Sequence, residues 1–396
     1  MSPPVDLAPT GAANLPESGL GRGWEPAAIL LLTLLLLSAG LVTLYSASSV
    51  LALRQNLPDT YFVVRQAGGA LMGLVALGIC AAIPYRLWEH LAWPLLWGSA
   101  ALLVLIVLPW TEGIAPEIKG ARRWLRLGSV TVQPSELAKI AIVIWTAFMA
   151  VRKRHHFRSL TRGLGPFFLV WAALLVPVML EPDLSTACLI LLLGMVVVFA
   201  AGARIGHFLF LGLLAVPLVK DQLAVGFRAE RLEAFLNPAA DPAGAGFQVR
   251  QSLVALGSGG LTGVGFGEGR QKYGFLPEPH NDFIFAMLGE EWGLLGVVFL
   301  VALYLAIVLV GFRIAGRAPD LFGELLAIGF TSLIALQATL HMTVGLGLVP
   351  TTGLALPLVS YGRSNLLVTM AALGILISVA RAAPGDQGLG RKGARA

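Results

Sequence analysis

The sequence predicts an all-α integral membrane protein with ten transmembrane helices and a large extracytoplasmic loop between helices 7 and 8. Of its 396 residues, 57% are hydrophobic and 13% are charged, whereas a soluble domain has about 25% charged residues. The apolar residues form runs that approach the roughly 20 residues needed to cross a bilayer as a helix. The net charge of +6 does not indicate nucleic-acid binding, because no segment outside the apolar runs is large enough for such a domain.

Ten apolar runs account for the expected helices, in order along the chain. The runs at 166–180 and 205–219 are short and contain proline, so they are the weakest of the set. An error in either would reverse the orientation of everything after it. The expected helices are 27–47, 63–84, 91–110, 136–151, 166–180, 184–202, 205–219, 284–312, 321–346 and 364–381.

The distribution of basic residues predicts the orientation. With ten helices and a cytoplasmic N-terminus, the loops that face inward collect the positive charge, as the positive-inside rule requires. These inward segments carry Arg86, "RKRHHFRSLTR" at 152–162, Arg204, Arg313, Arg317, Arg381 and tail residues Arg391, Lys392 and Arg395. Both chain ends are therefore expected in the cytoplasm.

The chain divides into three parts. Residues 1–24 are rich in Pro and Gly and are expected to be a disordered cytoplasmic tail. Residues 25–382 form the polytopic membrane domain, and residues 383–396 form a basic cytoplasmic tail. Two longer outer segments, 111–135 and 220–283, carry cations on the face that should be poor in them. An anionic ligand on the outer face would explain those cations.

The stretch "GARRWLRLGSVTVQPSELAK" at 120–139 runs from a basic loop into a helix. Ser135 is expected to cap this helix, with Glu136 in the first turn. Glu136 and Lys139 are three residues apart and can pair on one face. A cap with an interfacial ion pair and the wall of a polar pocket remain alternative interpretations. The outer position of Arg123 favours anion binding.

The stretch "LPEPHNDFIFAMLGEE" at 276–291 places carboxylates against an apolar run. Partial desolvation would raise the pKa of Asp282 toward the range of a general base. Alternatively, Asn281 or Asp282 caps the following helix. Glu290 and Glu291 lie inside the span, where an unpaired charge costs about 2.5–3.5 kcal/mol, so pairing with Lys139 or an arginine is expected.

Six motifs occur in order along the chain: "LYSASS", "GARRWL…QPSELAK", "EPDLSTA", "RLEAFLNPAADPAGAGFQVRQSLVALGSGG", "FLPEPHNDFIFAMLGEEWGLLG" and "PTTGLALPLVSYG". Together they resemble the SEDS family of peptidoglycan polymerases, the FtsW and RodA proteins. The resemblance covers about residues 25–382 and is closer to FtsW than to RodA. The family usually reads Ser-Tyr-Gly-Gly-Ser-Ser where this chain has "SYGRSN", with Arg363 and Asn365.

The resemblance implies a glycosyltransferase that polymerises lipid II, the undecaprenyl-pyrophosphate-linked disaccharide-pentapeptide, on the outer face of the bacterial cytoplasmic (inner) membrane during division or elongation. It implies that Asp282 is the essential acidic residue. It further implies that the substrate cavity is lined by Arg123, Glu136, Lys139, Gln251, Ser252, Lys272, His280 and Ser360.

The residues themselves fit this chemistry. One base that removes the proton of an acceptor hydroxyl suffices for an inverting transfer, and cations stabilise the departing pyrophosphate. Asp282 is the expected base, and Arg123, Lys139 and Lys272 are the expected cations. No metal site is expected, because no Asp/Glu cluster has ligand spacing, and the need for a divalent cation stays open.

The expected partners are lipid II and the nascent glycan, a class B penicillin-binding protein, divisome or elongasome proteins, and membrane lipids, with no nucleic acid. A lipid II flippase or transporter is the alternative function, although the two halves show no convincing internal repeat. A scaffold that recruits proteins through its cytoplasmic tails is a third.

Overall fold

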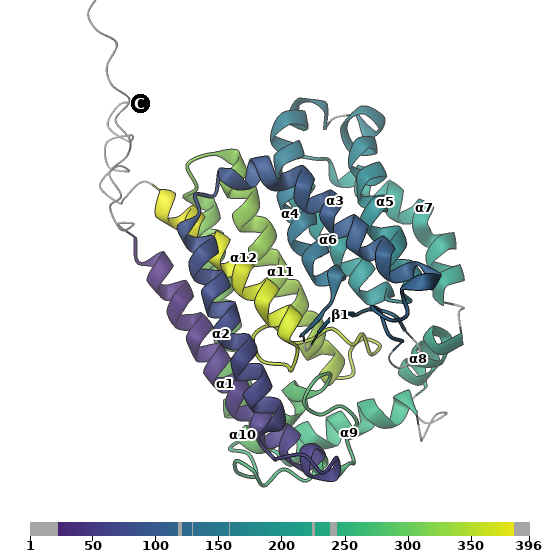
Figure 1. Ribbon diagram of the computed structural model, residues 1–396, viewed down its shortest axis with the longest axis vertical. Helices are drawn as coiled ribbons and strands as arrows, with labels where there is room; N and C mark the ends of the chain where they lie inside the picture. Colours follow the sequence, from purple (N-terminus) through teal and green to yellow (C-terminus); the bar gives the residue numbers. More distant parts are fainter. Residues whose placement is uncertain are drawn as a thin grey trace, which may run out of the picture.

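The computed structural model describes residues 23–117, 121–128, 130–157, 159–223, 226–237 and 244–383. Most of these residues are helical, and the only sheet among them is a short hairpin (Figure 1). The expected tails lie almost wholly outside the described residues. The helices are α1 Glu25–Arg54, α2 Tyr61–Ala82, α3 Leu87–Val107, α4 Pro134–Lys153, α5 Gly165–Leu180, α6 Leu184–Ala200, α7 Ile205–Leu223, α8 Gly226–Leu236, α9 Ala245–Ser258, α10 Ile284–Gly316, α11 Leu321–Gly345 and α12 Arg363–Ala382.

Each of the ten expected spans coincides with one of these helices, and the all-α membrane class is confirmed. Eight helices of the described chain are long and apolar enough to cross a membrane, and α6 is a shorter apolar helix. The count of ten spans therefore stays a prediction. The segment 220–283, expected as a loop, contains the two helices α8 and α9, which lie together near the lower end of Figure 1.

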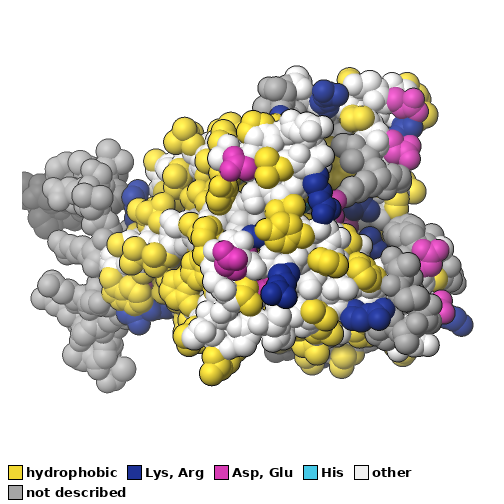
Figure 2. Space-filling view, turned by 90° about the horizontal axis from the view of Figure 1, so that it is seen from below, with side chains coloured by type: hydrophobic (Ala, Val, Ile, Leu, Met, Phe, Trp, Pro, Cys, Tyr) yellow, Lys and Arg dark blue, Asp and Glu magenta, His cyan; other side chains and the backbone are white. Residues whose placement is uncertain are grey.

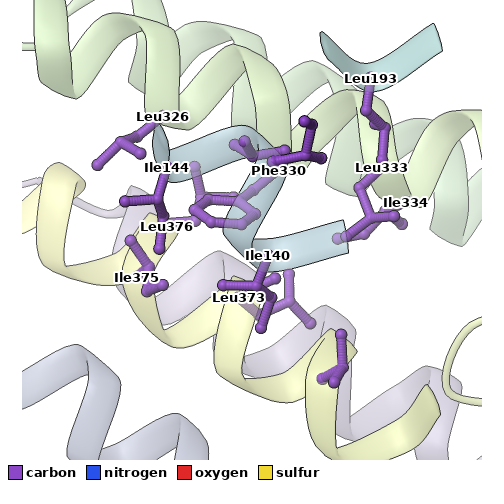
Figure 3. Close-up of a cluster of buried hydrophobic side chains, with 14 of the residues drawn as sticks. Ile140, Ile144, Leu193, Leu326, Phe330, Leu333, Ile334, Leu373, Ile375 and Leu376 are labelled. Atoms are coloured by element: carbon purple, nitrogen blue, oxygen red, sulfur yellow. The ribbon is translucent and has the colours of Figure 1, made fainter. Parts of the chain in front are cut away.

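Helices α4, α11 and α12 form the interior of the bundle. Of their most apolar stretches, 83%, 72% and 78% are buried, against 33–39% for α1, α2, α3, α5 and α10. Figure 3 shows their contact, where Ile140 and Ile144 of α4 meet Phe330 of α11 and Leu373 of α12. The outer helices expose Leu and Val side chains, as expected for helices that face lipid.

The hairpin between α3 and α4 is built from β1 (Leu125–Leu127) and β2 (Val130–Val132), which pair antiparallel. Helix α4 then begins at Pro134, with Gln133 as its N-cap and no side-chain capping bond. The expectation that Ser135 caps α4 is therefore wrong. Proline suits the first position of a helix because its missing N–H has no partner there in any case.

Helix α10 is broken at Gly293, whose φ of 66° and ψ of −164° are not helical. The loop after α9 supplies the missing partners. The N–H groups of Val264 and Gly265 donate to the carbonyls of Glu290 and Glu291, and those of Leu294 and Leu295 donate to the carbonyls of Gly260 and Leu261. Backbone groups freed at membrane depth are thus satisfied within the protein.

The face of the molecule at the bottom of Figure 1 carries both charged and hydrophobic side chains. Figure 2 shows that face, with acidic and basic side chains scattered over it and hydrophobic ones gathered toward the side of α1. Charges at this end and apolar helices behind it are what an interface between membrane and water requires.

Candidate active site

A cavity of about 1000 Å³ is enclosed by segments that are far apart in the sequence. Residues 121–136, 182–186 and 278–282, part of α8, and the loop and helix start at 352–365 all contribute to its lining. The Gly- and Pro-rich loop before α12 contributes residues 352–355 to this lining.

Asp282 lies on the cavity wall immediately before α10. Helix α10 has Phe283 as its N-cap and no side-chain capping bond, so the alternative that Asn281 or Asp282 caps it is wrong. The Asp282 N–H donates to the carbonyl of Glu278 at 3.2 Å, which holds the residue in a turn. Asp282 is half-buried and lies one residue before the N-cap of α10.

Ser360, one of the expected residues, and the neighbouring Tyr361 hold the segment that carries Asp282. The Ser360 hydroxyl donates to the carbonyl of Asn281 at 2.8 Å, and the Tyr361 N–H donates to the carbonyl of His280 at 3.1 Å. The His280 ring packs on Phe62 and Tyr361. His280 lines the cavity, whereas the buried Ser360 supports its wall from behind.

Arg123 faces the cavity from the segment before β1. Its Nε donates to the Glu181 carbonyl at 3.1 Å and its Nη2 to the Pro182 carbonyl at 2.7 Å, while Nη1 lies 3.7 Å from Asp183 Oδ2. Asp183 also caps α6, because its Oδ1 accepts from the Thr186 N–H at 3.1 Å. Arg123 therefore joins two walls of the cavity.

Arg231 of α8 is one of the cations of the outer segment 220–283, and it lines the cavity although it was not among the expected site residues. It contacts the carbonyl of Thr351 at 3.3 Å. Burial lowers the pKa of the Arg231 guanidinium, and the positive charge of Arg123 lowers it further. The negative charges of Asp282 and Asp183 act in the opposite direction. These four charged groups therefore share one electrostatic environment.

The expected pairing of Glu136 with Lys139 is confirmed at 2.7 Å. Glu136 lines the cavity and accepts from Asn365 Nδ2 at 3.1 Å. Lys139 is fully buried behind it and donates to Gln337 Oε1 at 3.1 Å. Gln337 in turn donates to the carbonyl of Ala355 on the cavity wall at 2.9 Å. Lys139 thus sets the position of two wall segments and does not itself line the cavity.

Lys272 is held by a different buried cluster. Its Nζ lies 3.1 Å from Glu291 Oε1 and donates to Ser46 Oγ at 2.9 Å. Glu290 accepts from the backbone N–H of Arg270 at 2.8 Å. The expectation that Lys139 or an arginine relieves these two glutamates is therefore wrong, because Lys272 and backbone N–H groups do so. Lys272 is not among the residues that line the cavity.

Gln251 and Ser252 lie on α9 and also stay outside the cavity lining. The buried Ser252 hydroxyl donates to the carbonyl of Gly345 at 2.6 Å and so ties α9 to the end of α11. The cavity thus brings together Arg123, Glu136, His280 and Asp282 of the expected set. Within the described residues, no three His, Cys, Asp or Glu side chains are placed to hold a metal ion.

Comparison with known proteins gives a consistent result. A family model described as "Cell cycle protein", which covers FtsW, RodA and SpoVE, matches residues 27–384. A Trichlorobacter lovleyi protein named "Probable peptidoglycan glycosyltransferase FtsW" is 42% identical over 352 residues, 89% of this chain and 92% of that protein.

Solved structures are similar as well. One, titled "Structural coordination of polymerization and crosslinking by a peptidoglycan synthase complex", has a TM-score of 0.76 at 31% identity and covers 93% of this chain and 100% of that chain. The Thermus thermophilus rod shape determining protein RodA has a TM-score of 0.67 at 30% identity, covering 92% of this chain and 98% of that chain.

Proposed function

The chain belongs to the FtsW/RodA/SpoVE family, and we propose that it polymerises lipid II in the cavity that Asp282 lines. It is an FtsW-like peptidoglycan glycosyltransferase, as its relatives' names state. The observation that carries the site assignment is the position of Asp282: it lines a large cavity, precedes the N-cap residue of α10, and interacts electrostatically with Arg231 of α8.

The proposed reaction needs one base and a set of cations. Asp282 removes the proton of an acceptor sugar hydroxyl, whose oxygen attacks the anomeric carbon of the donor. The bond from that carbon to the pyrophosphate oxygen breaks, and the undecaprenyl pyrophosphate leaves with the electron pair. The proton then passes from Asp282 to water. A single displacement of this kind inverts the anomeric centre.

Of the three cations expected from the sequence, only Arg123 lines the cavity. Lys139 and Lys272 are buried in ion pairs and are not among the lining residues. The basic side chains that line the cavity are Arg123, Arg231 and Arg363. Guanidinium groups suit this role, because they bind phosphate oxygens through two parallel hydrogen bonds. Fixed donors around a developing charge stabilise the transition state without reorganisation.

The proposal extends to the surroundings of the enzyme. We place the chain in the bacterial cytoplasmic membrane, with both ends inside and the cavity on the outer side. We propose a class B penicillin-binding protein as its partner, in line with a similar structure whose title joins polymerisation with crosslinking. The further partners depend on the process that the enzyme serves. They are divisome proteins if it acts in cell division and elongasome proteins if it acts in elongation.

The test is the Asp282→Asn variant, purified and assayed for glycan chains from lipid II in detergent. The amide keeps the size of the side chain but accepts no proton, so polymerisation should fall by about 10²–10⁴-fold, the usual contribution of a general base. Near-wild-type chains from this variant would remove Asp282 from the role of base. A wild-type protein that makes no chains but moves lipid II across vesicles would identify a flippase instead.

A further inference from the structure

Arg363 is a cation that the fold itself does not require. It is the first residue of α12 and lines the cavity. Its aliphatic stem lies against Gly69 of α2, where a Cβ would come within 2.9 Å of Arg363 Cγ. Its guanidinium reaches Thr131 Oγ1 at 3.5 Å, at the outer limit of a hydrogen bond. The side chain is therefore seated by its stem, and its charged end is weakly held.

The local electrostatics oppose a cation at this position. A helix N-terminus carries a partial positive charge, so a basic residue in the first turn is unfavourable. Within the part of the chain that the structure describes, no carboxylate lies within 4.0 Å of the Arg363 guanidinium. By contrast, Arg123 is bound by two carbonyls and has Asp183 nearby.

The start of α12 is already fixed by other groups. The Gly362 N–H donates to Gln66 Oε1 at 3.2 Å, and the Ser364 hydroxyl donates to the carbonyl of Thr131 at 3.2 Å. Asn365 is bound to Glu136. Arg363 adds little to this attachment, so its charge is left for a ligand.

We propose that Arg363 binds an oxyanion of the lipid-linked substrate and is a specificity-determining residue of this particular chain. The inference rests on the proposed function. Two groups of lipid II have the required chemistry, the pyrophosphate and the carboxylates of the stem peptide, and a guanidinium binds either through two hydrogen bonds. A residue that binds an anion of the substrate should change the affinity for substrate, which can be measured apart from turnover.

The test measures binding separately from turnover. Arg363→Gln is made in the Asp282→Asn background, where substrate is not consumed, and the Kd for lipid II in detergent is compared with that of Asp282→Asn alone. We expect the Kd to rise about tenfold or more, the loss of a charge-assisted hydrogen bond. Arg363→Lys should recover part of the affinity. Without ligand, Arg363→Gln should unfold at the same temperature or slightly higher, because a cation is removed from a helix N-terminus.

Two further probes identify the anion. If the stem peptide is the ligand, lipid II with amidated stem-peptide carboxylates should bind both proteins equally. If the pyrophosphate is the ligand, the Kd for the amidated substrate should still be higher with Arg363→Gln than without it. Inorganic pyrophosphate should then inhibit the Arg363→Gln enzyme less than wild type. An unchanged Kd for both substrates would overturn the inference while leaving the role of Asp282 in place. A fall in unfolding temperature with unchanged Kd would show that Arg363 is structural.

Discussion

At the residue scale, Glu181 is a carboxyl group outside the membrane spans whose pKa the fold changes strongly. It lies between α5 and α6, is 2% exposed, and its two carboxylate oxygens accept no hydrogen bond from the described residues. Burial, together with the nearby charge of Asp183 and against the opposing charge of Arg123, raises the pKa of its carboxyl to about 8. The folded protein therefore holds this carboxyl protonated at neutral pH.

A raised carboxyl pKa makes stability fall as pH rises. The unfolded chain releases this proton near pH 4.5 and the folded chain near pH 8. Between these pH values, the free energy of unfolding therefore decreases by roughly 1 kcal/mol per pH unit. The Glu181→Gln variant should lack this decrease, because its amide does not titrate. The unfolding midpoint of detergent-solubilised protein should therefore fall less steeply between pH 6 and 8 in this variant than in wild type.

The matched control is Glu112→Gln, which changes an exposed carboxylate paired with Arg122. This variant should follow the wild-type curve, since exposed ion pairs contribute little. Parallel curves for wild type and Glu181→Gln would show that Glu181 is ionised in the folded protein at neutral pH.

The sequence predicted some site residues at this scale and missed others for a physical reason. Asp282 stands next to the start of an apolar run, and Arg123 lies in an outer segment that should be poor in cations, so both attract attention in the sequence. The spacing of Glu136 and Lys139 alone predicts their pair. Arg231 and Arg363 enter the cavity only because separate loops meet there. Such proximity depends on tertiary packing, which no local pattern records.

At the scale of elements, the break in α10 was not predicted. The run from residue 284 to residue 312 is uniformly apolar apart from Glu290 and Glu291, and glycine inside such a run is ordinary in membrane helices. Only the loop that inserts beside Gly293 shows that the helix is interrupted there. Hydropathy describes what a helix faces, whereas a break depends on what packs against its backbone.

The Gly293→Ala variant should destabilise the protein. An added Cβ would lie 2.2 Å from the backbone nitrogen of Gly263, and the positive φ strains any residue other than glycine, at a cost on the order of 1–3 kcal/mol. We expect a lower unfolding temperature in detergent.

Gly78→Ala in α2 is the control, because a Cβ there meets open space. Alanine in a helix interior is more favourable than glycine by about 0.5–1 kcal/mol, so this variant should unfold at the same temperature or higher. An unfolding temperature for Gly293→Ala equal to that of Gly78→Ala would mean that the break adapts to a side chain.

At the scale of the whole molecule, the orientation of the bundle is open to direct measurement. In a background lacking Cys80 and Cys188, a cysteine is placed at Glu112 or at His155, both of which are exposed. A membrane-impermeant maleimide added to intact cells or spheroplasts should label position 112 and spare position 155. The expected topology puts 111–135 outside and 152–162 inside.

Labelling of position 155 from outside would contradict the ten-span arrangement with both ends in the cytoplasm. Membrane lysis is the control, since it should expose both positions equally. The experiment also decides the sidedness of the cavity, because position 112 belongs to the same outer segment as Arg123.

The break in α10 has a mechanical consequence for Asp282. The part of α10 before Gly293 is a short, buried stub joined through backbone bonds to the loop after α9 and through Glu291 to Lys272. Asp282 is attached to that stub and not directly to the long lipid-facing part beyond it. The same loop also accepts hydrogen bonds from the N–H groups of Leu294 and Leu295 beyond the break, so it clamps both sides of Gly293. A tilt of the long part of α10 in the bilayer would therefore be passed to the loop after α9 as well as to the segment that carries Asp282.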